Sequence, residues 1–554
     1  MTQPAQDLDI NNLAADYFAA LMREQPTWAH MLGDLSDVAS FEDASRAAED
    51  RQIKELDEFA ARAEAIEGLE GDDWVTQQVV ISHAHTNADV LRHRLTEITA
   101  DPIFGPQATW PIVAGMLGIP TADIAEAALL KVAGMGAHYR QLGERIAEGV
   151  TAGRAPARFA VLGVIEQIDD ILSTPAEDDP LVAAFQLQPE VDDVQWRARC
   201  ADVVASEVRP GMQAYRAALQ DLALPIARSD AEPGLASLEG GLAAYDALLR
   251  YYTTTDHSAG QIHQLGLEQV AKLEQEYRQL GAKALGTDDV QQIFEMMRSD
   301  PKLHFTEGQQ LVTASETAMQ RAWDAMGEWF EVLPKAPCAV EGVMGGAKAF
   351  YFPPAADGSR GGTFFINIDD PQSWGTFELE AMAFHEGIPG HHLQLAIAGE
   401  LPDSIPMIRK HAETAAYAEG WGLYTERLAD EMGLYSSEID RLGMLAADSM
   451  RACRLVLDTG LHAMGWSRQQ AIDYMLANSP LHEGVVIPEV DRYIVTPGQA
   501  TAYMIGRLEI LRMRAEARAR QGDAFEIKSF HSAVLDSGTL PLDVLDAVIR
   551  RRLP

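Results

Sequence analysis

The chain has 554 residues, 47% of them hydrophobic, and a formal net charge of −39 at pH 7. This acidic excess argues against binding to nucleic acids or to anionic membranes, because both attract positively charged surfaces. Three widely spaced cysteines, Cys200, Cys338 and Cys453, predict neither a disulfide framework nor a cysteine metal site, and they fit a reducing compartment.

Helical periodicity dominates the first half of the chain. Residues 1–18 lack a positively charged segment followed by an apolar run, so they do not resemble a secretory signal and predict a cytoplasmic location. Apolar stripes at helical spacing begin at Tyr17 and at Leu265. The uncharged stretch 102–122 is long enough to cross a bilayer, but its prolines exclude a regular helix. We expect a buried loop and a short helix there.

One clear β signal precedes the most informative motif. Residues 349–352 and 363–368 are typical of two short strands joined by a glycine-rich turn. An edge strand in this position could pair with an extended peptide, which gives main-chain affinity with little sequence selectivity. An ordinary hairpin is the alternative interpretation.

Residues 385–392 read His-Glu-Gly-Ile-Pro-Gly-His-His. In the familiar His-Glu-x-x-His zinc motif, both imidazoles lie on one helix face and the glutamate serves as general base. Here His391 follows His385 by six residues, so a regular helix would turn it through about 600° and point it away. His392 returns to the same face, but roughly 10 Å along the axis. A local bulge at the glycines and proline would bring His391 back, and we favour His391 over His392.

The third metal ligand is expected from the next helical segment. Glu419 shares a stripe with small apolar residues, where a carboxylate needs a cationic partner. Gly420 and Gly422 would let another backbone approach closely. Glu413 and Glu426 are the competing ligands.

Two motifs carry a family resemblance: HEGxPGHH at 385–392 and EGWGLY at 419–424. They resemble the signature of the bacterial domain-of-unknown-function family 885. The similarity continues through segments that start at Tyr251, Arg454 and Tyr493, and it covers most of the chain after about residue 240.

That family looks like a distant relative of helical zinc peptidases of the Taq carboxypeptidase, neurolysin and angiotensin-converting enzyme types. The resemblance implies a mainly α, two-lobed zincin-like fold with a small β-sheet beside the active-site helix. It also implies one catalytic domain, 1–554. Within it we expect an N-terminal helical lobe at about 1–335, the sheet and ligand helices at about 336–435, and a C-terminal helical part at about 436–554. The Gly-His pair of those peptidases matches Gly390 and His391.

Residues after the ligands could complete an active site. Related peptidases use downstream His or Tyr side chains to bind the oxyanion, which makes His462 and Tyr503 candidates. Arg454, Arg492 and Arg507 could bind the C-terminal carboxylate of a substrate through bidentate contacts, as a carboxypeptidase requires.

The predicted chemistry is metal-assisted hydrolysis. One Zn²⁺ per chain, held by His385, His391 and Glu419, would activate a water while Glu386 accepts its proton. Cobalt or manganese would also suit these ligands. We predict a zinc metallopeptidase, either a carboxypeptidase or an oligopeptidase, acting on short peptides, with homodimer formation left open. The alternatives are a non-catalytic metal protein that binds a peptide or metabolite, and a metal-dependent amidase or esterase.

Overall fold

The structure is a computed structural model that describes residues 9–344, 347–355, 358, 360–412 and 414–554. It is mainly helical and contains a small sheet, as the sequence predicts. Within the described ranges, no helix combines the length and the apolar composition that crossing a membrane requires.

The first part of the chain is helical up to residue 217. Its helices are α1 (Ile10–Glu24), α2 (Pro26–Met31), α3 (Arg46–Glu64), α4 (Gly71–Arg92), α5 (Pro106–Ala114), α6 (Ala122–Thr151), α7 (Arg158–Ser173), α8 (Pro180–Ala184), α9 (Asp193–Val203) and α10 (Arg209–Ala217). The short strands β1 (Gly118–Ile119) and β2 (Gln186–Leu187) pair in parallel. The proline-rich stretch 102–122 thus holds the short helix α5, as expected, but the expected burial of its loop is wrong, because Phe104 is 56% exposed.

The helices α5 to α10 share a hydrophobic core. Its fully buried members lie between Val38 and Ala223, and Trp196 and Tyr139 are among the largest. The helices α1, α3 and α4 instead contribute to another core, which also contains Leu393, the residue after the motif at 385–392. The N-terminal helices therefore divide between two cores.

The middle of the chain contains four helices and then the small sheet. The helices are α11 (Gly241–Thr253), α12 (Ala259–Ala284), α13 (Val290–Ser299) and α14 (Gly308–Ala325). The strands of the sheet are β3 (Cys338–Val343), β4 (Ala349–Phe352) and β5 (Gly362–Asn367). The strand order is β3-β5-β4. β4 and β5 are antiparallel, with Phe350 opposite Phe365, so the expected hairpin is present. β3 pairs in parallel with β5 and was not predicted.

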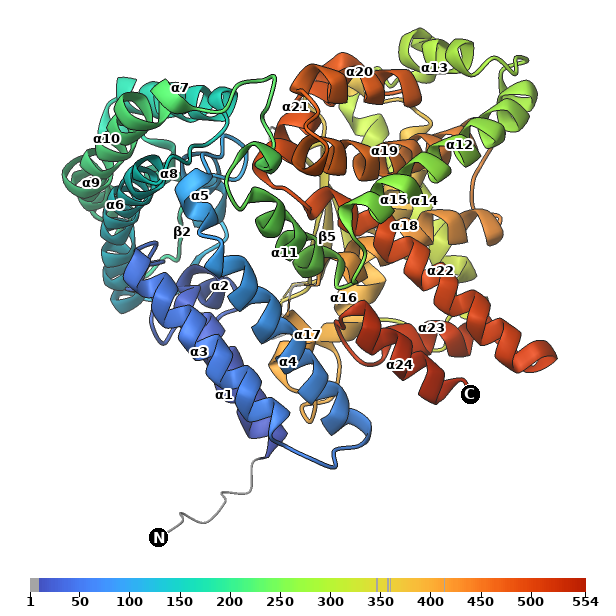
Figure 1. Ribbon diagram of the computed structural model, residues 1–554, viewed down its shortest axis with the longest axis horizontal. Helices are drawn as coiled ribbons and strands as arrows, with labels where there is room; N and C mark the ends of the chain where they lie inside the picture. Colours follow the sequence, from blue (N-terminus) through green and yellow to red (C-terminus); the bar gives the residue numbers. More distant parts are fainter. Residues whose placement is uncertain (1–8, 345–346, 356–357, 359, 413) are drawn as a thin grey trace.

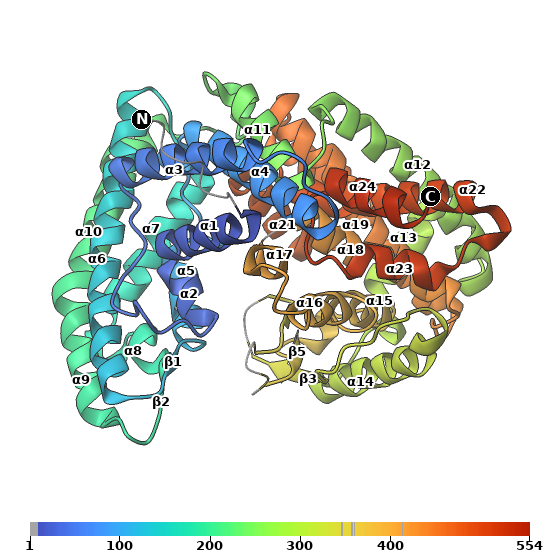
Figure 2. The ribbon, with the colours of Figure 1, turned by 90° about the horizontal axis from the view of Figure 1, so that it is seen from below.

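The last part of the chain provides the site. Its helices are α15 (Glu378–Glu386), α16 (His391–Gly399), α17 (Met407–His411), α18 (Ala415–Glu431), α19 (Glu438–Ala463), α20 (Arg468–Asn478), α21 (Glu483–Val495), α22 (Ala502–Gln521), α23 (Ile527–Leu535) and α24 (Leu542–Arg552). Figure 1 shows α6, α9 and α10 on one side of the molecule and α18 to α24 on the other. Figure 2 shows the strands β3 and β5 between α14 and the pair α15 and α16.

The helices α18 and α22 pack closely because both carry glycine at their crossing. A Cβ added to Gly420 would lie 2.5 Å from the backbone of Gly506, and one added to Gly506 would lie 1.9 Å from the carbonyl oxygen of Ala416. The expectation that Gly420 lets a second backbone approach is therefore confirmed. This crossing places the start of α22 beside Glu419.

Candidate metal centre

The histidine motif is a break between two helices. α15 ends at Glu386 and α16 begins at His391, with residues 387–390 outside both helices. Gly387 and Gly390 have ψ angles of −114° and −127°, far from helical values. A side chain at Gly390 would overlap the carbonyl oxygen of His385, 1.8 Å away. The expected bulge in a continuous helix is therefore wrong: the chain leaves the helix and starts a second one, which redirects His391.

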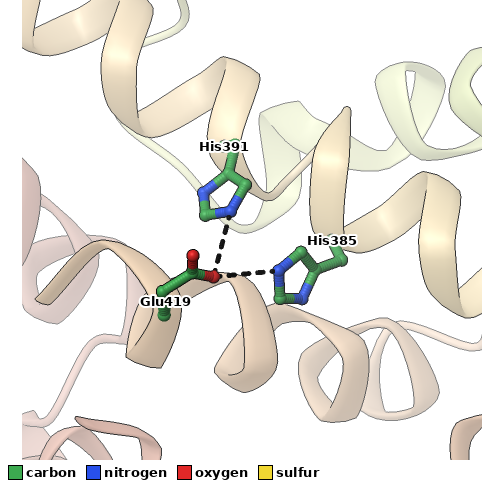
Figure 3. Close-up of side chains that lie close together, drawn as sticks. All are labelled: His385, His391 and Glu419. Atoms are coloured by element: carbon green, nitrogen blue, oxygen red, sulfur yellow. Dashed lines mark ion pairs between the residues drawn. The ribbon is translucent and has the colours of Figure 1, made fainter. Parts of the chain in front are cut away.

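The break brings both histidines to one carboxylate. The Nε2 atoms of His385 and His391 each lie 3.4 Å from Oε2 of Glu419, which α18 contributes. Figure 3 shows the three side chains converging, and their ligand atoms all lie within 4.8 Å of one another. In a tetrahedral zinc site with bonds of about 2.1 Å, ligand atoms are separated by roughly 3.4 Å. The spacing therefore suits a single zinc ion.

The electrostatics of the cluster also suit a cation. Burial opposes protonation of His385, but the carboxylates of Glu419 and Glu426 outweigh it and raise the pKa of His385 to about 9. Burial would raise the pKa of Glu419, but hydrogen bonds from His385 and His391 hold it well below its usual value. An ionised carboxylate and two imidazoles are a donor set that zinc accepts.

Glu426 binds the ring nitrogen of His385 that does not face Glu419. The Nδ1 atom of His385 donates to Oε1 of Glu426 over 2.8 Å, which leaves Nε2 facing Glu419. Glu426 is buried, and its Oε2 atom has no hydrogen-bond partner among the described residues. Metal-binding histidines commonly donate their second N–H to a carboxylate in this way. Glu426 therefore orients a ligand, whereas Glu413, the other competitor, lies outside the described residues.

Gly422 gives the His385 ring its space. A Cβ at this position would lie between 2.7 and 3.0 Å from three ring atoms of His385. The expected close approach at Gly422 therefore involves a side chain, whereas Gly420 approaches a backbone. The EGWGLY segment thus provides a candidate ligand, a helix crossing and room for a second candidate ligand.

His392 points away from the cluster. Its Nδ1 atom accepts a hydrogen bond from the hydroxyl of Tyr351, at 2.9 Å, and its Nε2 atom donates to the carbonyl of Ala336, at 3.1 Å. Burial lowers the pKa of His392 to about 4, so the ring is neutral at pH 7. His392 connects α16 to the β3–β4 region, and His391 is the histidine beside Glu419.

Glu386 lies next to a ligand without belonging to the ligand set. It follows His385 at the end of α15, is half-buried, and its negative charge helps to raise the pKa of His385. Its carboxylate forms no hydrogen bond or ion pair with another described side chain. A free carboxylate beside a metal centre is placed to act as a base.

Tyr503 lies near the start of α22, the helix that crosses α18 beside Glu419. Burial and the nearby Glu419 carboxylate raise the pKa of its phenol, whereas Arg454 and Arg492 oppose this change. The Arg454 guanidinium carbon lies 4.5 Å from the centre of the Tyr503 ring.

Two of the other expected residues are engaged elsewhere. His462 accepts a hydrogen bond at Nδ1 from the amide of Leu235 and donates from Nε2 to the carbonyl of Tyr493, and burial lowers its pKa to about 3. Arg507 is buried in an ion pair with Asp448. The structure therefore does not bring His462 to the cluster and leaves Arg507 in a structural pair.

Comparisons with known proteins agree with the sequence motifs. The family model described as "Bacterial protein of unknown function (DUF885)" matches residues 26–549, so the chain belongs to this family. No curated protein matches it.

Two solved structures are similar over nearly the whole chain. The crystal structure of the "putative lipoprotein" from Colwellia psychrerythraea has a TM-score of 0.90 and 26% identity, and covers 98% of this chain and 98% of that chain. A "putative lipoprotein of unknown function" from Shewanella oneidensis has a TM-score of 0.78 and 17% identity, over 98% of this chain and 99% of that chain. The second likeness concerns the fold alone.

Proposed function

We propose that the chain is a metal-dependent hydrolase of peptide bonds, a zinc metallopeptidase with one Zn²⁺ per chain. One observation carries this proposal: two imidazole nitrogens and a half-buried carboxylate converge with zinc-like spacing beside the unliganded carboxylate of Glu386. A purely structural metal site has no need of this adjacent base. Manganese or cobalt would fit the same donors.

When bound, the ion would lower the pKa of a water molecule and polarise the scissile carbonyl. Glu386 accepts the proton of that water and then transfers it to the leaving amine. The Tyr503 hydroxyl donates a hydrogen bond to the oxyanion that develops on the carbonyl. His385 is held in place by Glu426, so that Nε2 faces the centre. His462 has no part in this scheme, because both ring nitrogens already bind backbone groups.

The test is hydrolysis of a mixed library of short peptides by the zinc-loaded protein, with products identified by mass spectrometry. The Glu386→Gln variant is the matched blank, since it should bind zinc yet lose at least 100-fold in activity. Shortened C-termini seen only with the native protein would identify a carboxypeptidase, and internal cuts an oligopeptidase. Full activity in Glu386→Gln, or no products from the zinc-loaded native protein, would contradict the proposal.

We further propose a cytoplasmic location. Cys200, Cys338 and Cys453 are all unpaired, which supports a reducing compartment. Detection of the native protein in the membrane fraction of its source cells would contradict this location without bearing on the chemistry.

A further inference from the structure

A closed ring of polar contacts surrounds Tyr503. The Arg454 guanidinium lies against the Tyr503 ring and donates to Glu489 from Nη2, at 2.8 Å. Glu489 also accepts from Arg492, at 3.0 Å, and Arg492 donates from Nη1 to Gln499, at 2.7 Å. The Nε2 atom of Gln499 lies 3.5 Å from the Tyr503 hydroxyl and completes the ring.

The ring has a surplus of positive charge. Among the described residues, Glu489 is the one carboxylate within 4.0 Å of either Arg454 or Arg492, so two guanidinium groups share one negative charge. A third arginine, Arg451, lies 5.9 Å from the centre of the Tyr503 ring. Of the carboxylates in the described part of the chain, Glu426 alone lies within 4.0 Å of Arg451, at 3.8 Å, and it is already bound to His385. Clustered buried guanidinium groups that share one carboxylate are costly, and here they occur in a chain of net charge −39.

Two buried donors in this region lack an acceptor. Arg454 is 5% exposed and its Nη1 atom has no hydrogen-bond partner among the described residues. Arg451 is 8% exposed, and its Nε atom is likewise without a described partner. Arg454 cannot turn away to find one, because Tyr493 and Glu489 hold its other two nitrogens. The Nη1 atom of Arg454 is therefore available to donate to an acceptor from outside the chain, and its positive charge favours an anionic one.

The distance to the metal centre limits what this acceptor is. Arg451 lies 3.8 Å from Glu426, which binds His385 at 2.8 Å. Arg451 and Arg454 both lie near the Tyr503 ring, at 5.9 and 4.5 Å from its centre. One peptide residue spans at most about 3.6 Å. A peptide whose last amide carbonyl lies at the metal would therefore carry its terminal carboxylate within one residue of that carbonyl, so its partner must be an arginine close to the ligand residues.

We propose that Arg454, supported by Arg451 and Arg492, forms a subsite for the C-terminal carboxylate of the substrate. The chain would then be a carboxypeptidase that removes the last residue of short peptides. This inference rests on the proposed hydrolytic function and adds the substrate class to it. Arg454 is the specificity-determining residue, and the Glu489 bridge holds it and Arg492 in place.

The test compares N-acetylated penta-alanine with its C-terminal amide. The native zinc-loaded protein should cleave the free acid about 100-fold more efficiently, because a charged hydrogen bond to a carboxylate is lost with the amide. Arg454→Gln should remove this preference by lowering kcat/KM for the acid alone, and Arg454→Lys should restore part of it. Arg216→Gln, which removes one surface arginine paired with Asp169, is the matched control and should keep the preference.

A second measurement separates the two proposals. Calorimetric binding of both peptides to the zinc-loaded Glu386→Gln variant should show at least tenfold tighter binding of the acid. Equal cleavage and equal binding of acid and amide would overturn the carboxylate subsite and leave the hydrolase intact. Tighter binding of the acid without cleavage by the native protein would support the subsite while refuting the hydrolase. If Arg454→Gln lowers kcat/KM equally for the acid and the amide, Arg454 does not determine specificity.

Discussion

The Nδ1 atom of His385 lies 2.8 Å from Oε1 of Glu426, on the side of the ring that faces away from Glu419. This hydrogen bond fixes which nitrogen of His385 is offered to a metal. Replacing Glu426 with Ala should therefore weaken zinc binding by about 10- to 100-fold, as expected for loss of a partner that orients a ligand.

Competition with a chelator measures this effect. Glu431→Ala is a suitable control, because Glu431 lies on the same helix but has an exposed side chain that pairs with Arg514 instead of a histidine. Unchanged zinc affinity in Glu426→Ala would show that His385 keeps its orientation without the carboxylate.

Gly422→Ala should also weaken zinc binding, for a steric reason. The new methyl group would lie 2.7 Å from Cε1 and 2.8 Å from Nε2 of His385, closer than ordinary packing allows. Overpacking of this kind costs about 1 to 3 kcal/mol, so we expect zinc affinity to fall about tenfold.

Gly399→Ala is the matched control for this experiment. It adds the same methyl group on α16, where nothing lies within 4 Å. If both variants bind zinc equally well, the space around His385 does not limit its position.

Asp458 should make stability depend on pH. Its carboxylate accepts hydrogen bonds from the Tyr245 hydroxyl, at 2.5 Å, and from the amide of Gly498, at 2.9 Å, in the turn before the Tyr503 helix. Burial raises its pKa from 3.8 to about 7. The folded chain thus binds a proton here that the unfolded chain releases, so this stabilisation is present at low pH and is lost as the pH rises towards 7.

The Asp458→Asn variant isolates this effect. The free energy of unfolding of the native chain, relative to the variant, should decrease by about 3 kcal/mol between pH 5 and pH 8. Denaturant unfolding at the two pH values provides the measurement. A difference that does not change with pH would mean that Asp458 does not titrate in this range.

Local patterns were enough to predict part of the secondary structure, but not how its elements pack together. The helical character and the β4–β5 hairpin follow from periodicity, which neighbouring residues determine. β3 was missed because its six residues include Glu341 and Gly342, and it is stabilised by parallel pairing with β5, which follows it in the chain only after β4. Such pairing cannot be predicted from the sequence of the strand itself.

The candidate site shows the same division. Residue chemistry and spacing indicated His385, His391 and Glu419, and the structure brings these three together. The geometry between the histidines was not predictable, because glycines that tolerate a bulge also tolerate a complete break in the helix. Glu489 and Tyr493 were overlooked for another reason: they reach Arg454 only through the packing of α21 against α19.

Zinc titration of the metal-free protein, monitored by chelator competition, tests the metal centre most directly. The native chain and the His392→Gln variant should each bind one zinc ion tightly, because His392 bonds to Tyr351 and Ala336 instead. His391→Gln should bind zinc at least 100-fold more weakly, since it removes one of three ligands. If His391→Gln binds zinc as tightly as the native chain, or if His392→Gln alone loses it, then His385, His391 and Glu419 do not form the metal centre.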